Sequence, residues 1–221
     1  MGYIDFLSNH GDRLLDGAII TAEQTVMAIL VALFLAITMG LMRLSSNLLI
    51  RGAATVYIEI FRGTSLLVQL FWIFFVLPLF GITLDKFTAG FLTVGMNLGA
   101  YGAEVVRGAI ISVPRGQYEA AIALNMSAYT RMRRIIFPQA IAIMLPAWGN
   151  LFIELLKGTA LVALIAVTDL MFQAKQINSS TFLSVESFGT ALIIYYVMAR
   201  FIITPTMRWL ETVMSRHLVR N

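Results

Sequence analysis

Long apolar runs separated by short polar stretches make up most of the chain. Five of these runs are long enough to cross about 30 Å of hydrocarbon as helices, at residues 19–42, 57–80, 87–110, 138–167 and 188–210. The polar stretches between them are too short to hold a separate folded domain. The pattern predicts one all-α, polytopic membrane domain over residues 1–221 with about five transmembrane helices, preceded by a short helix at residues 3–15 on the outer surface.

Composition supports this interpretation and excludes several classes. Hydrophobic residues make up 59% of the chain and charged residues 13%, against about 25% charged in soluble proteins. The absence of cysteine excludes disulfides, thiolate metal sites and cysteine nucleophiles, and the two histidines lie near the chain ends. We therefore predict no catalytic site, no metal site and no cofactor. The net charge of +4 marks membrane topology in a protein of this kind rather than a nucleic-acid partner.

Lysine and arginine predict the orientation in a bacterial cytoplasmic membrane. Five spans place the termini on opposite sides, and basic residues accumulate on the cytoplasmic side. One side holds only Arg13, Lys86 and Lys175. The other holds eleven arginines, at positions Arg43, Arg51, Arg62, Arg107, Arg115, Arg131, Arg133, Arg134, Arg208, Arg216 and Arg220. We expect an external N-terminus and a cytoplasmic C-terminus.

The most polar internal segment is residues 115–140, RGQYEAAIALNMSAYTRMRRIIFPQA. Pro114 suits the start of a helix. Asn125 suits the left-handed conformation that often ends one. Ser127 is a good N-cap for a second helix, and Pro138 disfavours helical geometry at Phe137. The local pattern predicts two short helices joined by a tight corner.

This segment resembles the EAA motif of permease subunits in ATP-binding-cassette importers. The motif's Glu-Ala-Ala triplet falls on Glu119, Ala120 and Ala121, and its later apolar-Pro pair on residues 137–138. Three further segments, EIFRGTSLLVQL at 59–70, GAYGAEVVRGAIISVPRGQ at 99–117 and LFIELLKGTALVALI at 151–165, are similar to signatures of the polar amino-acid branch (histidine, glutamate, glutamine, arginine and opine permeases). The resemblance runs from about residue 25 to residue 210.

Two positions depart from the family pattern. Asn125 replaces a glycine, and since both residues accept a positive φ, the corner is expected to be kept. Ser65 replaces a proline, and the loss of that proline is expected to straighten the start of the second span. Within the branch, the segments around residues 99–127 are similar to those of permeases for ectoine and hydroxyectoine.

The resemblance implies a type I importer fold and a set of partners. These are two ATPase subunits, a second permease subunit (the same or a related chain), an external solute-binding protein and the lipid bilayer. The chain has no phosphate-binding GxxxxGK[ST] loop, so ATP hydrolysis is expected in the separate ATPase. The resemblance assigns coupling to the ATPase to the loop at 112–138, and within it to Glu119, Ala120, Ala121, Leu124 and Asn125.

Charged residues at membrane depth mark the predicted translocation pathway, because their exposure to lipid is costly. Glu154 and Lys157 are three residues apart on the fourth run, with Asn150 one turn earlier and Thr159 after them. Both charge signs in one place would suit a zwitterionic solute. An equally weighted interpretation is that Glu154 and Lys157 only neutralise each other. Arg200 could pair with Glu104 or Glu154, or extend toward the inner surface, and we favour the last.

Three alternatives remain open from the sequence. A secondary transporter or channel would work without an ATPase, but no internal repeat is evident. A membrane-embedded enzyme would need a catalytic constellation at membrane depth. A scaffolding protein would use the polar segment for docking alone. Gly95 and Gly99 form a GxxxG pattern that serves packing within the chain or, as the less favoured option, a subunit interface.

Overall fold

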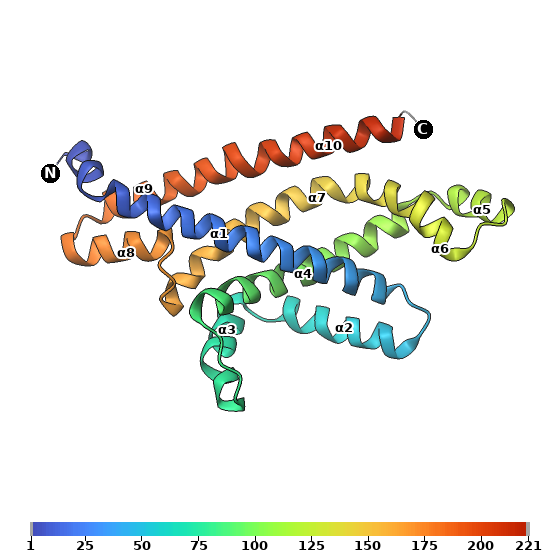
Figure 1. The fold of residues 1–221 in the computed structure, drawn as a ribbon, viewed down its shortest axis with the longest axis horizontal. Helices are drawn as coiled ribbons and strands as arrows, with labels where there is room; N and C mark the ends of the chain where they lie inside the picture. The colour runs from blue at the N-terminus through green and yellow to red at the C-terminus, as the bar shows by residue number, and fades with distance from the viewer. Residues whose placement is uncertain (1, 220–221) are drawn as a thin grey trace.

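The protein is helical almost throughout. The structure, a computed structural model, describes residues 2–219, and these contain helices and turns but no strand (Figure 1). Arg220 and the side chain of Arg216, two of the predicted cytoplasmic arginines, lie outside the described residues. Within residues 2–219 the chain ends lie at opposite ends of the long axis (Figure 1). This placement agrees with an odd number of crossings.

The first helix is longer than predicted. α1 (Tyr3–Arg43) contains 41 residues and joins the predicted surface helix at 3–15 to the first apolar run without a break. No proline occurs in this stretch to interrupt the hydrogen-bond ladder. The prediction of a separate N-terminal helix is therefore wrong.

Small residues bring α1 against α4 (Lys86–Ser112). Ala28, Ala32 and Ala36 are fully buried on α1. On α4, a Cβ added at Gly95 would lie 2.7 Å from the Val31 Cβ, and at Gly99 it would meet Leu35 at 3.0 Å. The GxxxG pattern therefore serves close helix packing inside this chain, as favoured from the sequence.

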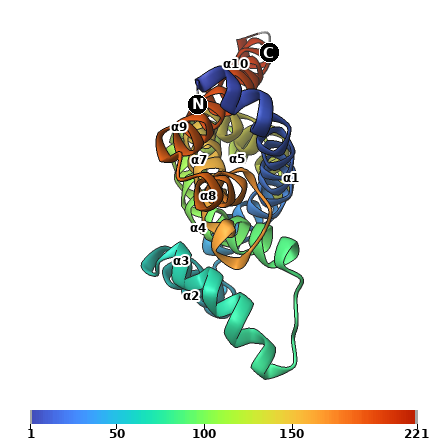
Figure 2. The same ribbon diagram turned by 90° about the vertical axis from the view of Figure 1, so that its left-hand side faces the viewer.

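The second apolar run is broken by a sharp bend. α2 (Leu48–Gly63) ends at Gly63, and after Thr64 and Ser65 the chain continues as α3 (Leu66–Phe71), η1 (Trp72–Val76) and η2 (Leu77–Phe80), at 107° to α2. Figure 2 shows α2 and α3 set to one side of the remaining helices. The expected straightening at Ser65 is wrong, because Thr64 (φ −119°, ψ 156°) and Ser65 (φ −70°, ψ 134°) are extended without a proline.

Buried amides hold this bend. Gln69 Nε2 donates to the Phe61 carbonyl at 2.9 Å and to Thr64 Oγ1 at 2.7 Å. Asn97 Nδ2, from α4, donates to the same Phe61 carbonyl at 2.9 Å and to Gln69 Oε1 at 3.0 Å. A helix that breaks leaves carbonyls without partners, and these two side chains supply donors for them.

A single long helix begins within the polar segment and continues beyond it. α5 (Arg115–Ala123) turns into α6 (Ala128–Arg131), which continues through η3 (Met132–Ile136), α7 (Phe137–Gly158) and η4 (Thr159–Ile165). The stretch Ala128–Ile165 is one helix of 38 residues. Beyond it lie α8 (Leu170–Thr181), α9 (Ser184–Val197), η5 (Met198–Ile203) and α10 (Thr204–Val219).

A buried acid begins α8. Asp169 is fully buried, accepts a hydrogen bond from the Phe172 amide at 2.9 Å and lies 3.3 Å from the Tyr195 hydroxyl. Burial raises the pKa of the Asp169 carboxyl to about 6, because the charged form loses hydration. The hydrogen bond from the amide of Phe172 opposes this shift only in part.

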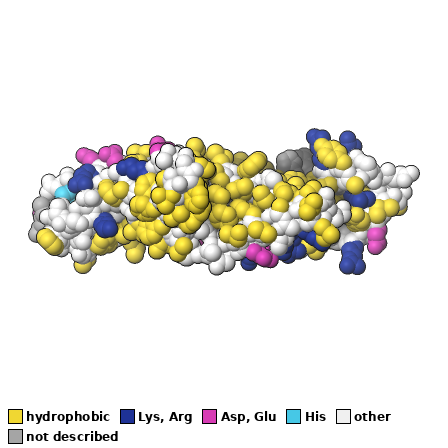
Figure 3. All heavy atoms as spheres, turned by 90° about the horizontal axis from the view of Figure 1, so that it is seen from below, with side chains coloured by type: hydrophobic (Ala, Val, Ile, Leu, Met, Phe, Trp, Pro, Cys, Tyr) yellow, Lys and Arg dark blue, Asp and Glu magenta, His cyan; other side chains and the backbone are white. Residues whose placement is uncertain are grey.

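Length and hydropathy identify the helices able to cross a membrane. Among the described residues these are Tyr3–Arg43, Ala128–Ile165 and Ser184–Met214, with the bent pair Leu48–Gly63 and Leu66–Phe80 as a fourth if it forms one span. α4 is not among them, since Asn97, Glu104 and Arg107 lower its hydropathy. The count of five stays a prediction. Figure 3 shows apolar side chains over the middle of one face and arginines and lysines gathered toward its ends.

Candidate functional site

The polar segment forms a helical hairpin at one end of the molecule (Figure 1). α5 begins after Pro114, whose extended backbone (φ −53°, ψ 134°) makes it the N-cap and not the first helical residue. α5 then runs to Ala123, and the next helix begins five residues later. The predicted pair of helices with a tight corner is thus present.

The corner at Asn125 has the predicted left-handed conformation. Asn125 has φ +57°. The Met126 amide donates to the Ala121 carbonyl at 3.0 Å and the Asn125 amide to the Ile122 carbonyl at 2.8 Å. These two bonds are the Schellman pattern that closes a helix C-terminus. The geometric prediction for Asn125 is confirmed.

The second helix begins as predicted but does not end as predicted. Ser127 caps it, with its hydroxyl accepting from the Thr130 amide at 3.2 Å. Phe137, however, is helical (φ −64°, ψ −41°), and Pro138 lies in the first turn of α7. The wide π-type turn of η3 precedes this proline and spreads the backbone, so the ring is accommodated without ending the helix. The prediction of a break at Phe137 is therefore wrong.

The predicted coupling residues divide between two faces of the hairpin. Glu119, Ala120, Leu124 and Asn125 are exposed, and Leu124 leaves 76% of its surface uncovered. Ala121 is only 3% exposed. The exposed residues can contact a partner, whereas Ala121 packs inside the hairpin and does not form part of its outer surface.

The predicted pathway residues lie mainly on one open face of α7. Asn150, Glu154 and Lys157 are exposed, whereas Thr159 is fully buried and its hydroxyl donates to the Leu156 carbonyl at 2.7 Å. No ion pair joins Glu154 to Lys157 among the described side chains, so mutual neutralisation is not seen. Arg200 likewise pairs with neither Glu104 nor Glu154 there.

This face leaves Glu154 and Lys157 exposed, with α9 and η5 beside Lys157. Lys157 lies at the edge of a cavity of about 380 Å³, which is also lined by Ala160, Leu192, Tyr195, Tyr196 and Ala199. α1 packs against both α4 and α7. Because exposed charges are costly in lipid, this open face must meet water, a solute or another protein surface.

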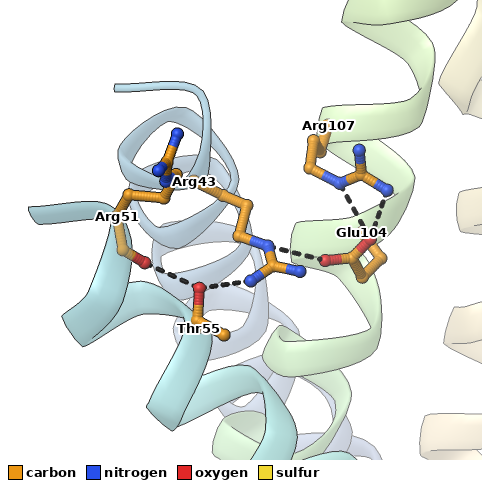
Figure 4. A network of polar contacts seen from close by, with 5 residues as sticks. All are labelled: Arg43, Arg51, Thr55, Glu104 and Arg107. Carbon is orange, nitrogen blue, oxygen red and sulfur yellow. Dashed lines mark hydrogen bonds and ion pairs between the residues drawn. The ribbon is translucent and has the colours of Figure 1, made fainter. Parts of the chain in front are cut away.

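A charge network that links α1, α2 and α4 was not predicted from the sequence. The Glu104 carboxylate on α4 lies 2.8 Å from Arg107 Nη2 and 3.5 Å from Arg43 Nε at the end of α1 (Figure 4). Arg43 also donates to the Thr55 hydroxyl on α2, which in turn donates to the Arg51 carbonyl at 2.8 Å. The spacing of Glu104 and Arg107 is visible in the sequence, but nothing there brings in Arg43.

Arg62 lies near the bend. It is fourteen residues beyond Leu48 on α2, about 21 Å further along the helix. Its guanidinium lies 5.3 Å from the ring centroid of Tyr101 on α4. Arg62 and Tyr101 thus place a cation and an aromatic ring near the bend, and the assignment of Arg62 to the cytoplasmic side stays a prediction.

Comparisons with known proteins agree with this architecture. Residues 25–216 match the family described as binding-protein-dependent transport system inner membrane component. A probable amino-acid ABC transporter permease, y4tF of Sinorhizobium fredii, is 43% identical over 87% of each chain. The glutamine transport system permease GlnP of Escherichia coli is 34% identical over 90% of this chain and 91% of its own. A crystal structure of an amino acid ABC transporter with histidines is 36% identical, with a TM-score of 0.86 over 98% of this chain and 99% of its own.

Proposed function

The chain belongs to the family of inner membrane components of binding-protein-dependent transport systems, and from this membership we propose that it forms the translocation pathway of an ATP-driven amino-acid importer. The protein is thus a transport component and not an enzyme. Membership leaves the non-ABC transporter, membrane enzyme and scaffold alternatives without support. The observation that carries the proposal is the exposed hairpin of α5 and α6. Its second arm, α6, is the start of the long helix that bears Asn150, Glu154 and Lys157.

The family implies an ATPase subunit and a solute-binding protein as partners. We propose two copies of the ATPase, an external binding protein and a second permease subunit of the same or a related chain. The exposed residues Glu119, Ala120, Leu124 and Asn125 would contact the ATPase, with Ala121 seating α5 inside the hairpin. ATP-driven closure of the ATPase dimer would then shift the population between inward-open and outward-open states of the spans.

The proposed solute is a polar amino acid or a compatible solute derived from one. GlnP is named for glutamine, and the similar crystal structure is of an amino acid transporter with histidines. This similarity supports amino acids as the class of solute but does not identify which amino acid is carried. A face with Glu154 and Lys157 exposed and unpaired offers both charge signs to a zwitterion. The sequence similarity around residues 99–127 is the support for ectoine or hydroxyectoine as a narrower proposal.

The proposed arrangement in the membrane is one transmembrane domain with five spans. The external end would hold the N-terminus and α8, and the cytoplasmic end the hairpin and the C-terminus. The opposite placement of the chain ends and the arginines of the hairpin support this orientation (Figures 1 and 3).

Reconstitution tests the proposal. The chain would be placed in proteoliposomes with the ATPase and binding protein of its own system, and uptake of labelled glutamine, histidine, ectoine and hydroxyectoine would be measured. We expect ATP-dependent uptake of at least one of these that requires the binding protein. Uptake that persists without ATP, or that no member of the panel shows, would contradict the proposal.

A further inference from the structure

Tyr118 and Arg131 form a contact across the mouth of the hairpin. The Arg131 guanidinium carbon lies 4.0 Å from the Tyr118 ring centroid, and Arg131 Nη2 donates to the Tyr118 hydroxyl at 2.9 Å. Thirteen residues separate them in the chain. The same pair therefore combines a cation–π contact with a hydrogen bond from a charged donor, which are additive sources of attraction.

This contact adds a side-chain link to the two places where the chain itself holds α5. These are Pro114, through which α5 follows α4, and the corner at Asn125, where the chain reverses. Tyr118 lies two turns before that corner, in the first half of α5, and Ala121 between them is buried. The link at Tyr118 therefore joins α5 to the following helix at a point away from the corner.

Arg131 belongs to the long helix Ala128–Ile165. A force on α5 can reach this helix through the corner, and also directly through the Tyr118 ring. We propose that the Tyr118–Arg131 contact is a positioning pair that makes α5 and α7 move as one body, so that work done on α5 is delivered to the spans. This inference rests on the proposed importer function and adds to it the residues that determine coupling.

No acidic side chain among the described residues forms an ion pair with Arg131. Among the described side chains, both ion pairs involve Glu104, in the second half of α4, and neither involves Arg131. Glu119, its acidic neighbour on α5, is exposed and unpaired with it. Arg133 and Arg134 are exposed, and among the described side chains neither forms a hydrogen bond or cation–π contact with α5, so this contact distinguishes Arg131 from the adjacent arginines.

The functional test measures the number of solute molecules transported per ATP hydrolysed in the reconstituted complex, for the unmodified protein (the parent) and for variants of the contact. The solute is whichever of the four labelled compounds the parent transports. We expect Tyr118→Ala and Arg131→Ala to lower this ratio about three- to tenfold while ATPase binding is kept, since contacts of this type shift a two-state equilibrium by such factors. Tyr118→Phe, which keeps the ring and loses the hydroxyl, should fall between. Arg208→Ala, at an exposed arginine on α10 outside the coupling loop, is the matched control and should equal the parent. An unchanged ratio in both alanine variants would overturn the inference.

A distance measurement tests the same contact without ATP or solute. The chain has no cysteine, so Gly116→Cys on α5 and Ile143→Cys on α7 introduce a unique pair of sites for spin labels. Gly116 has open space around it and Ile143 is 45% exposed. We expect a narrow distance distribution in the parent and in Arg134→Ala, and a broader one with Tyr118→Ala or Arg131→Ala.

The transport ratio and the distance distribution test the importer function and the positioning role of the contact separately. A parent complex that hydrolyses ATP but carries no panel solute would contradict the proposed function, while the distance distribution would still decide whether the contact orients α5. If the alanine variants do not assemble, Tyr118→Phe and Arg131→Lys decide both tests, because they conserve size and charge. A distribution equally narrow in every variant would overturn the positioning role.

Discussion

Asn97 on α4 donates from its side-chain amide to Oε1 of Gln69 on α3 at 3.0 Å, and both side chains are buried beside the 107° bend. Together they donate to the Phe61 carbonyl, which the break in the helix leaves without its usual partner. The bend is thus stabilised by a residue 28 positions away from Gln69 in the chain.

Loss of the Asn97 amide should weaken this bend. We expect Asn97→Ala to lower the free energy of unfolding by about 1–3 kcal/mol, because the Phe61 carbonyl loses a donor and Gln69 Oε1 is left buried and unpaired. Thermal unfolding in detergent measures the change. Asn150→Ala, an exposed amide on α7, is the control and should stay within about 0.5 kcal/mol of the parent. A stability loss no larger than this control would contradict the role given to Asn97.

The corner at Asn125 should require only a residue that tolerates positive φ. Asn125→Gly should transport as well as the parent, since glycine adopts φ near +57° without strain. Asn125→Val should lose transport, because a β-branched residue in this conformation costs about 1–2 kcal/mol or more and distorts the corner. Reconstituted uptake measures both variants. Equal activity of the valine variant would show that the corner geometry is dispensable.

Two changes on α5 should separate ATP hydrolysis from transport. Glu119→Lys reverses an exposed charge on the partner-facing surface, and Ala121→Asp places a carboxylate in a packed position and dislodges α5. We expect both proteins to remain in the membrane fraction while uptake falls at least about tenfold, a change that corresponds to about 1.4 kcal/mol. Uptake and ATP turnover indistinguishable from the parent would remove the basis for assigning this surface to the ATPase.

The charge of Glu154 should contribute to the affinity for the solute. Glu154→Gln keeps the shape of the side chain and removes its charge, so a cationic group of the solute would lose an attractive partner. We expect the solute concentration giving half-maximal stimulation of ATP hydrolysis to rise by about threefold to tenfold, the range of about 0.7–1.4 kcal/mol. Glu23→Gln, at an exposed acid on α1, serves as the control. An unchanged half-maximal concentration would favour a structural role for Glu154.

The buried Asp169 should make stability depend on pH. Its folded pKa of about 6 lies above the ordinary value of 3.8, so between these values the folded state binds more protons than the unfolded state. Stability from this group is present at low pH and is lost as pH rises toward and through about 6. Asp169→Asn should flatten the melting temperature between pH 4 and pH 7 relative to the parent. Asp16→Asn, an exposed acid, should leave that profile unchanged.

Local patterns were predictable from the sequence. Asn125 adopts a positive φ and Ser127 caps a helix because each depends on a few neighbouring residues. Helix content and the apolar runs follow from composition over windows of about 20 residues. The family resemblance rests on segments spread over most of the chain, and the match at residues 25–216 confirms it.

Features that depend on distant residues were not predictable. The bend at Thr64 needs Asn97, and the Glu104 network needs Arg43, sixty-one positions earlier. Pro138 remains helical because of a wide turn whose presence no local preference signals.

The continuous helix Ala128–Ile165 has a mechanical consequence. Thirty-eight residues give a rod about 57 Å long. A tilt of about 5° at the hairpin would carry the far end through about 5 Å, a distance close to one helical turn. In the proposed importer, a small displacement imposed by a soluble partner on the hairpin would thereby be converted, by length alone, into a movement comparable to the size of a small solute at the other end of the helix.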